Sequence, residues 1–490
     1  MSLVVGDKET QHSALSTQHS VVEALKNLLP ADRVLWRDYD LMLYEYDGSI
    51  DKHRPLAVVF PLSTQEVSDT VRICHRFNIA YTARGAGTGL SGGAIPAQGG
   101  VLISLARMNR ILEIDVDNMR AVVEPGVVNL RLGQATQAFG LTYVPDPSSQ
   151  KACTIGGNVG ENSGGPHTLR YGVTTNHTLG LEAVLPGGDV VRLGGTTADS
   201  PGYDLMGLIV GSEGTLGIVT RIWVRLVPIN ETVKTILAVF RNMEDASSAV
   251  AGMIAKRIVP AAIEMMDNLT IRAIESRSPS GYPVEAEGVV LIEVDGLREE
   301  VDAQAPAVEQ VCLENGALSV RLARDDAERA ALWAGRKGAF AAIGRLTPDY
   351  YTVDGVVPRT KLPATLARIQ EISRESGFRI ANVFHAGDGN LHPLILWDSD
   401  VAGAEERVID AGAEIMRVCA AAGGSLSGEH GIGMEKKDLM PLIFSQDDVA
   451  QMLRIKSAID PSGLCNPGKI FPTAGRCLEL FARRGRAVGW

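Results

Sequence analysis

Two histidine-bearing segments in the last quarter of the chain carry the residues best suited to chemistry. His385 and His392 stand seven residues apart with glycines between them, and apolar runs flank both. This pattern predicts a strand, a tight turn and a second strand, with one imidazole at each strand end. Glu429 and His430 follow side by side in another glycine-rich turn. Two imidazoles and a carboxylate form a plausible ligand set for a divalent metal with an open position, and a pair of structural histidines is the simpler alternative.

A third candidate for chemistry is Arg336, which precedes Lys337 in a segment of helical composition. The planar guanidinium of arginine can bind a carboxylate through two parallel hydrogen bonds. Arginine and lysine are also common on exposed helices. Taken alone, this segment favours a plain surface role.

Glycine is the other unusual feature, with 52 of 490 residues against a usual share of about 7%. Many glycines gather in the segments 84–100, 154–165 and 211–220. Residues 87–92 fit the GxGxxG expression, but the glycines and proline that follow cannot begin the helix that a dinucleotide fold requires. We expect loops whose backbone N–H groups hold the phosphates of a large cofactor. Tight turns in a β-rich domain are the alternative.

The composition narrows the class of protein. Lys and Arg number 47 against 58 Asp and Glu, a net charge of −11, which argues against nucleic acid as a partner. The six cysteines are scattered, so we expect reduced thiols and no iron–sulfur site. The first residues do not resemble a signal peptide, and no apolar run is long enough for an integral membrane segment. A cytoplasmic protein is expected, with any membrane association made through a partner.

Hydrophobic periodicity predicts alternating strands and helices, which must position these groups. Ser63 and Glu66 have the spacing of a capping box at the start of a helix. Before residue 230 we expect strands near 56–62, 79–83, 101–105, 111–116, 120–127 and 217–229, and a helix at 129–139. After it we expect helices at 242–256, 297–315, 325–343, 402–421 and 446–459, with strands at 235–240, 288–294 and 351–357. The predicted domains are 1–54 (an N-terminal helical segment), 55–230 (cofactor-binding), 231–425 (substrate or cap), 426–472 (a return to the cofactor site) and 473–490 (a tail).

Three segments of the sequence resemble a known FAD domain. The runs RGAGTGLSGGA, PDPSSQKACTIGGNVGENSGG and GSEGTLGIVT are similar to the vanillyl-alcohol-oxidase type, also called the p-cresol-methylhydroxylase type. The resemblance covers about residues 20–472, within the family of the FAD-linked glycolate oxidase subunit and the D-lactate and D-2-hydroxyglutarate dehydrogenases. It implies an α+β fold, in which a FAD-binding domain of two subdomains is followed by an α+β substrate or cap domain.

The resemblance also implies which residues contact FAD. They are Arg84, Gly85, Ala86, Gly87, Thr88, Gly89, Pro147, Ser148, Thr154, Gly157, Asn158, Ser163, Glu213, Gly217, Ile218, Val219 and Asn466, the last in the segment NPGK. Relatives with covalent flavin often carry a histidine in the first loop, where this chain has Thr88 and Gly89. Non-covalent FAD is therefore expected.

The same resemblance implies roles for the chemistry-bearing residues. His385, His392 and Glu429 would hold a divalent metal, often zinc, while His430 would act as general base and Arg336 would bind the substrate carboxylate. The implied reaction is oxidation of a small 2-hydroxy acid, glycolate or D-lactate, to the 2-oxo acid by hydride transfer to FAD N5.

Several alternatives stay open at this point. A D-2-hydroxyglutarate dehydrogenase is disfavoured because those relatives carry a lysine at about Thr352. A metal-dependent hydrolase would leave the glycine segments unexplained. A non-catalytic flavin-binding subunit of a larger redox complex would not need both histidines, Glu429 and His430. The resemblance suggests that electrons leave to an iron–sulfur partner subunit or an electron-transfer flavoprotein.

Overall fold

The computed structural model describes residues 18–197 and 202–473. The predicted tail at 473–490 lies outside the described residues except for residue 473, as does the first third of the predicted segment 1–54. The described chain begins in a helix over residues 18–28, which continues to the predicted stop near Pro30.

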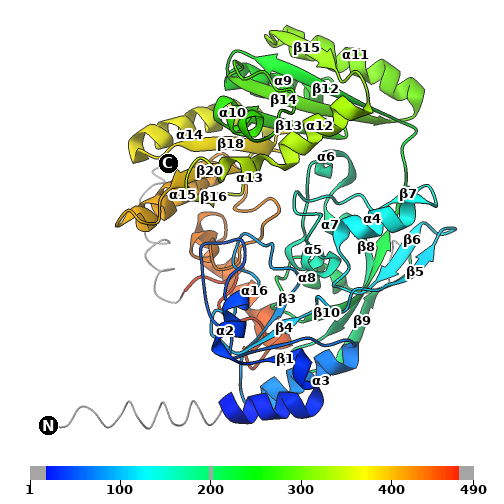
Figure 1. Ribbon diagram of the computed structural model, residues 1–490, viewed down its shortest axis with the longest axis vertical. Coiled ribbons are helices and arrows are strands. Elements are labelled where there is room, and N and C mark those ends of the chain that lie inside the picture. The colour runs from blue at the N-terminus through cyan, green and yellow to red at the C-terminus, as the bar shows by residue number, and fades with distance from the viewer. Residues whose placement is uncertain (1–17, 198–201, 474–490) are drawn as a thin grey trace.

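The first layer of the lower half in Figure 1 is a small sheet of order β1-β2-β4-β3. Its strands are β1 (Val34–Leu35), β2 (Ala57–Val59), β4 (Val101–Ser104) and β3 (Tyr81–Arg84), and β4 pairs in parallel with both β2 and β3. Helix α3 (Thr64–Arg76) starts at Ser63, whose side chain accepts a hydrogen bond from Glu66 N at 3.3 Å. The predicted capping box is only half formed, because the Glu66 carboxylate binds Arg33 and Leu62 N instead.

The second sheet of this half is antiparallel, with the order β5-β6-β10-β8-β9. Its strands are β5 (Ile111–Asp115), β6 (Arg120–Val123), β10 (Ile218–Arg225), β8 (Thr178–Val184) and β9 (Val190–Gly194). A third, two-stranded sheet joins β7 (Leu141–Thr142) to β11 (Val227–Pro228). Helices α4 (Asn129–Gln137), α5 (Ile155–Glu161), α6 (Thr168–Tyr171), α7 (Thr174–His177) and α8 (Met206–Ile209) complete this half.

The upper half in Figure 1 is built on a nine-stranded sheet. Its strands are β12 (Thr232–Phe240), β13 (Ala262–Asp267), β14 (Gly288–Gly296), β15 (Ser319–Leu322), β16 (Asp349–Thr352), β17 (Gly355–Val356), β18 (Ile380–His385), β19 (Asn390–Leu391) and β20 (Pro393–Trp397). One face packs against α9 (Met243–Ala255), α11 (Arg298–Glu314), α14 (Leu362–Ser376) and α15 (Ala404–Ala421). The other face packs against α10 (Asn268–Arg277), α12 (Asp326–Lys337) and α13 (Ala339–Ile343). Helices thus cover both faces, which makes this half a three-layer α+β unit.

Two features of the upper half differ from the sequence prediction. The helix expected over 325–343 is broken at Gly338, which ends α12 and begins α13. Strand β13 and helices α10 and α14 were not predicted. Strand β13 is buried along most of its length, so it lacks the polar alternation that identifies a half-exposed strand.

The chain returns to the lower half after α15, as the orange and red segment of Figure 1 shows. Helix α16 (Gln446–Ile459) leads into a stretch that runs beside β3. There Tyr81 N donates to Leu464 O at 2.9 Å and Asn466 N donates to Tyr81 O at 2.8 Å. The last described segment is therefore hydrogen-bonded to the strand that enters the first glycine-rich loop.

Two further expectations concern cysteines and membrane spans. The five cysteines among the described residues are free and buried. Of the helices described, none combines the length and the apolar character that crossing a bilayer demands.

Candidate active site

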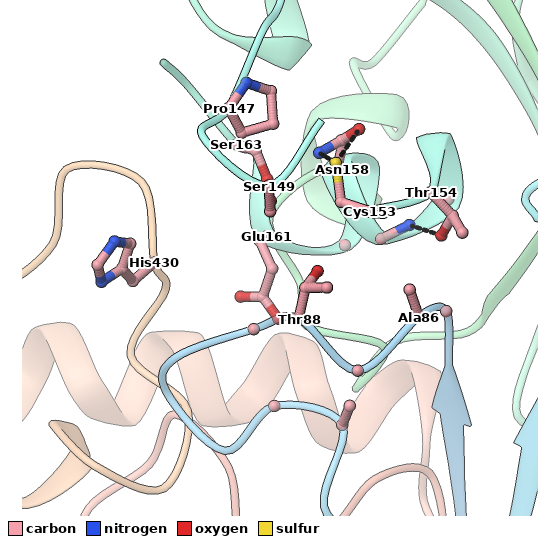
Figure 2. A pocket seen from close by; sticks show the side chains of 18 of the residues that line it. Ala86, Thr88, Pro147, Ser149, Cys153, Thr154, Asn158, Glu161, Ser163 and His430 are labelled. Atoms are coloured by element: carbon pink, nitrogen blue, oxygen red, sulfur yellow. Dashed lines mark hydrogen bonds between the residues drawn. The ribbon is translucent and has the colours of Figure 1, made fainter. Parts of the chain in front are cut away.

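A cavity of about 380 Å³ lies between the two halves. The glycine-rich segments of the lower half form most of its wall, and residues from α12, α13 and the turn of His430 close it. Figure 2 shows residues of the first two glycine-rich segments with His430 nearby. Pockets for cofactors typically enclose about 300–1,000 Å³. The cavity therefore joins the two groups of residues that the sequence singled out.

The residues assigned to FAD by resemblance can be located individually. Those that line the cavity are Arg84, Gly85, Ala86, Gly87, Thr88, Gly89, Pro147, Ser148, Thr154, Gly157, Asn158, Ser163, Glu213, Gly217, Ile218 and Val219. Asn466 is not among the lining residues and lies behind the wall, 1% exposed. Its amide nitrogen donates to Gly93 O at 2.9 Å and to Glu213 O at 2.7 Å, so it holds two cavity segments together.

The first glycine-rich loop fits a bound phosphate group. Among the described residues, the N–H groups of 86–90 have no hydrogen-bond acceptor. Gly87 has a φ of +71°, and a Cβ there would overlap the Arg84 guanidinium. Glycine thus keeps the loop close to Arg84, and free N–H groups beside a cation suit an anion.

The second segment is a helix rather than an irregular loop. Helix α5 begins after Thr154, whose hydroxyl accepts a hydrogen bond from Gly157 N at 3.3 Å. The glycines in this segment obscured the helix at the level of sequence, because glycine disfavours helices by about 1 kcal/mol per residue relative to alanine.

The histidine pair lies where the sequence predicted, at the ends of strands. His385 ends β18, and His392 stands between β19 and β20. The Nε2 atoms of His385 and His392 lie 3.2 Å and 3.1 Å from the same oxygen, Glu429 Oε1. The second oxygen, Glu429 Oε2, is buried without a hydrogen-bond partner among the described residues. Two imidazole nitrogens and a carboxylate thus converge in one place.

Two buried carboxylates that the sequence prediction missed lie behind these histidines. Glu264 Oε1 is 2.7 Å from His385 Nδ1, and Asp354 Oδ1 is 3.8 Å from His392 Nδ1. Both carboxylates are fully buried. A carboxylate behind the imidazole fixes the ring and presents its other nitrogen to a metal. Glu264 interrupts the apolar residues 262–266 of β13, and an acid in such a run is the signal that could have identified it.

Asp354 also shapes the turn that carries His430. Its Oδ2 accepts hydrogen bonds from Ser427 Oγ at 2.6 Å, from His430 N at 2.9 Å and from Lys436 Nζ at 3.2 Å. The N–H of Gly428 reaches the same carboxylate at 3.1 Å. These bonds restrain the turn and leave Asp354 little capacity to bind anything else.

Two sets of three residues could hold a metal ion: His385, His392 and Glu429, or Asp354, His392 and His430. The first set fits better, because Glu429 Oε2 lacks a partner whereas Asp354 already accepts several hydrogen bonds. The donor types of the first set suit zinc and similar divalent metals.

His430 lies in the cavity wall, parallel to His392. Their ring centroids are 4.9 Å apart with an interplanar angle of 3°. Burial lowers the pKa of His430 to about 4, and Asp354 only partly opposes this effect. The imidazole is therefore neutral at neutral pH and able to accept a proton.

Arg336 is buried, 2% exposed, so the alternative of a plain surface role is wrong. Its guanidinium forms an ion pair with Glu264 and lines the cavity. Its Nε has no hydrogen-bond partner among the described residues. Arg336 can thus bind an anion while Glu264 holds it in place.

The next residue, Lys337, ties the upper half to the lower. Lys337 Nζ donates to Asp146 Oδ2 at 2.9 Å, and His167 lies between Asp146 and Glu293 at 3.0 Å and 3.1 Å. Trp333 Nε1 donates to Glu293 at 2.6 Å. Burial alone would lower the pKa of His167, but Asp146 and Glu293 raise it to about 10. This interdomain ion cluster stands directly beside the cavity residue Pro147.

Comparison with known protein families matches nearly all of the chain outside its ends. The model described as "FAD binding domain" matches residues 55–194, and the model described as "FAD linked oxidases, C-terminal domain" matches residues 229–470. The glycolate oxidase subunit GlcD of Escherichia coli (strain K12) is 47% identical over 94% of this chain and 93% of that protein. The D-lactate dehydrogenase of Anaerostipes hadrus is 34% identical over 92% of this chain and 97% of that protein.

Solved structures with low sequence identity share the fold. A substrate-bound p-cresol methylhydroxylase has a TM-score of 0.79 at 18% identity, over 93% of this chain and 97% of that one. The 4-ethylphenol oxidase of Gulosibacter chungangensis has a TM-score of 0.77 at 21% identity, over 93% and 98%. These similarities confirm the predicted α+β fold of the vanillyl-alcohol-oxidase type. The chain therefore belongs to the family of FAD-linked oxidases, and FAD is its cofactor.

Proposed function

We propose that this protein oxidises glycolate or D-lactate to the corresponding 2-oxo acid. One observation carries the proposal: His392, Glu429, His430 and Arg336 line the same cavity as the glycine-rich segments that suit FAD. The names of the glycolate oxidase and D-lactate dehydrogenase relatives support the substrate class. A metal-dependent hydrolase would not need the flavin cavity.

FAD would be held without a covalent bond by residues 84–89, α5 and the segment 213–219, since Thr88 and Gly89 stand where relatives with covalent flavin often carry a histidine. FAD supplies the acceptor for a hydride. His385, His392 and Glu429 would hold a divalent metal, which supplies Lewis acidity that lowers the pKa of the substrate hydroxyl. Acid precipitation of the protein would test the non-covalent binding. Non-covalent FAD should be released into the supernatant, whereas covalent flavin would remain with the precipitated protein.

The chain's own residues then have separate tasks. Arg336 binds the substrate carboxylate through its unpartnered Nε and so orients the α-carbon. His430 takes the hydroxyl proton on its imidazole, whose Nε2 lies 4.0 Å from Glu429 Oε1. The substrate thus loses a proton to His430 and a hydride to the cofactor, which accounts for both electrons. Asp354 and Glu264 keep these groups in place.

The charges around the cavity favour a substrate with a single carboxylate. Among the described lining residues, the cations are Arg84, Arg336 and Lys337. Arg84 lies in the first glycine-rich loop, and Lys337 is paired with Asp146. Arg336 is left for one carboxylate, so a second carboxylate, as in D-2-hydroxyglutarate, would find no further unpaired cationic side chain among these lining residues.

The test is dye reduction by the purified, FAD-loaded protein with glycolate, D-lactate, L-lactate and D-2-hydroxyglutarate. We expect turnover with glycolate or D-lactate and much slower turnover with the other two. Faster turnover with D-2-hydroxyglutarate than with glycolate or D-lactate would contradict the proposed substrates. A flavin spectrum without turnover on any of them would support a non-catalytic subunit instead.

Electrons must leave the reduced protein after each turnover. We further propose that they pass to a partner, either an iron–sulfur subunit or an electron-transfer flavoprotein, because the chain itself offers no second redox centre in its described residues. The name of the relative GlcD as a subunit supports an assembly. Such a partner would also place a cytoplasmic enzyme at a membrane.

A further inference from the structure

Glu161, the last residue of α5, carries a carboxyl group that the proposed reaction does not use. It lines the cavity and reaches toward the loop of Thr88, with His430 across the cavity (Figure 2). Its Oε2 is shielded from solvent and has no hydrogen-bond partner among the described residues. Buried polar atoms are almost always hydrogen-bonded, so an unpartnered one in a cavity wall points to a ligand that completes its bonding.

Glycines of two segments make room for this carboxyl group. A Cβ at Gly93 would lie 2.6 Å from Glu161 Oε1, and a Cβ at Gly431 would overlap Glu161 Oε2. Gly89 is also close, with its Cβ position 3.8 Å from Glu161 Oε1. The carboxyl group is thus confined between the first glycine-rich loop and the turn that follows His430.

Within the part of the chain that the structure describes, no cation forms an ion pair with Glu161. The charged and titratable groups that face it are Glu213, Asp47, Lys436 and Lys469. Lys436 is engaged by Asp354 at 3.2 Å, and Lys469 Nζ donates to the carbonyl of Ile95. Glu213 accepts hydrogen bonds from Ile432 N and Gly433 N, both at 2.7 Å.

An unpaired buried carboxylate is costly and normally takes up a proton instead. Burial raises the pKa of Glu161 well above its ordinary value, and the neighbouring Glu213 and Asp47 add to the effect. The proton makes one of its oxygens a hydrogen-bond donor.

We infer that Glu161 is a FAD-binding residue whose neutral carboxyl group donates a hydrogen bond to the reacting end of the cofactor. The inference rests on the proposed function, since His430 and the metal-ligand set determine which end of FAD reacts. A negative charge at this position would oppose the charge that the cofactor gains on reduction, whereas a neutral carboxyl group does not.

The test compares Glu161→Gln and Glu161→Ala in the FAD-loaded protein without substrate. Glutamine keeps the shape of the side chain, its neutrality and a hydrogen-bond donor. We therefore expect the equilibrium between oxidised and reduced flavin at pH 7 to change less than about threefold. For a two-electron couple this corresponds to a shift of the potential of about 14 mV. Alanine removes the hydrogen bond, so the FAD dissociation constant should rise about fivefold to tenfold. Flavin fluorescence and redox titration with indicator dyes measure these quantities.

Either of two outcomes would overturn the inference. A larger positive shift of the potential in Glu161→Gln would mean that wild-type Glu161 is an anion. Wild-type FAD affinity in Glu161→Ala would mean that it does not contact the cofactor. Glu161→Gln is isosteric and keeps the potential test valid if the alanine variant is unstable.

A matched control is Glu435→Gln. Glu435 also neighbours Lys436, and burial raises its pKa to about 7, but its Oε1 accepts a hydrogen bond from Tyr351 at 2.8 Å. We expect its FAD affinity and flavin potential to match those of wild type. The FAD affinity and the flavin potential of the Glu161 variants are measured without substrate. A failure of the protein to oxidise glycolate or D-lactate would therefore refute the proposed function and leave these measurements valid.

Discussion

Glu264 Oε1 lies 2.7 Å from His385 Nδ1, and the same buried carboxylate forms an ion pair with Arg336. One side chain on β13 therefore positions both a proposed metal ligand and the proposed carboxylate-binding residue. Burial opposes the charge of Glu264, but Arg336 and His385 hold its pKa below the ordinary value, so it is an anion in the folded protein. The two proposed functions of the site, holding a metal and binding a carboxylate, would share this support.

Replacing Glu264 by glutamine should weaken metal binding about 10- to 100-fold, the usual effect of removing a carboxylate behind a ligating histidine. Arg336 would also lose its ion-pair partner, so KM for the hydroxy acid should change together with metal affinity. Competition titration of zinc against a chelator measures the first effect. Glu293→Gln on the neighbouring strand β14 is the control, and equal zinc affinity in both variants would contradict the assignment.

Replacing His430 by alanine should lower kcat about 10²- to 10⁴-fold, the range that general acid–base catalysis contributes. FAD and metal content should stay at wild-type levels, because His430 is not one of the proposed metal ligands His385, His392 and Glu429. Steady-state dye reduction measures the turnover, and absorbance and metal analysis measure the content. Turnover close to wild type in a fully loaded variant would exclude His430 as the base.

Removing the metal with a chelator should abolish most turnover while the flavin absorbance is retained. The expected difference arises because two of the three proposed metal ligands, His385 and His392, lie in the upper half of the molecule, whereas most of the cavity wall that would hold FAD lies in the lower half. Adding zinc back should restore the activity. Unchanged turnover after the ion has been shown to leave would mean that His385, His392 and Glu429 form a structural cluster only.

Residue spacing predicted the contiguous histidine pair, the family resemblance supplied the roles of Arg336, Glu429 and His430, and the buried carboxylates behind the histidines were missed. His385 and His392 belong to one strand–turn–strand unit, so their spacing predicted their geometry. Glu264 reaches His385 only through the pairing of β13 with β18, and no local pattern specifies which strands pair. Helix α5 was missed for the opposite reason, because its glycines disfavour a helix locally while the Thr154 cap and tertiary packing stabilise one.

The interdomain ion cluster leads to a prediction about pH. In the folded protein Asp146 and Glu293 raise the pKa of His167 to about 10, whereas an unfolded chain has a histidine pKa of about 6.5. The stabilisation from this proton is complete below about pH 6.5 and is lost as the pH rises toward about 10. The thermal midpoint of wild type should therefore be higher than that of His167→Gln. This difference should be largest at pH 6, smaller at pH 8 and close to zero at pH 10.

Thermal unfolding of both proteins at the three pH values checks this, with His53→Gln as the control. His53 is exposed and outside the interdomain ion cluster, so its variant should follow the wild-type curve at every pH. A difference between wild type and His167→Gln that stays constant from pH 6 to pH 10 would show that His167 is neutral and contributes only packing. A shrinking difference would instead show that charge joins the two halves beside the FAD cavity, since Asp146, Lys337 and Glu293 then act on a protonated imidazole.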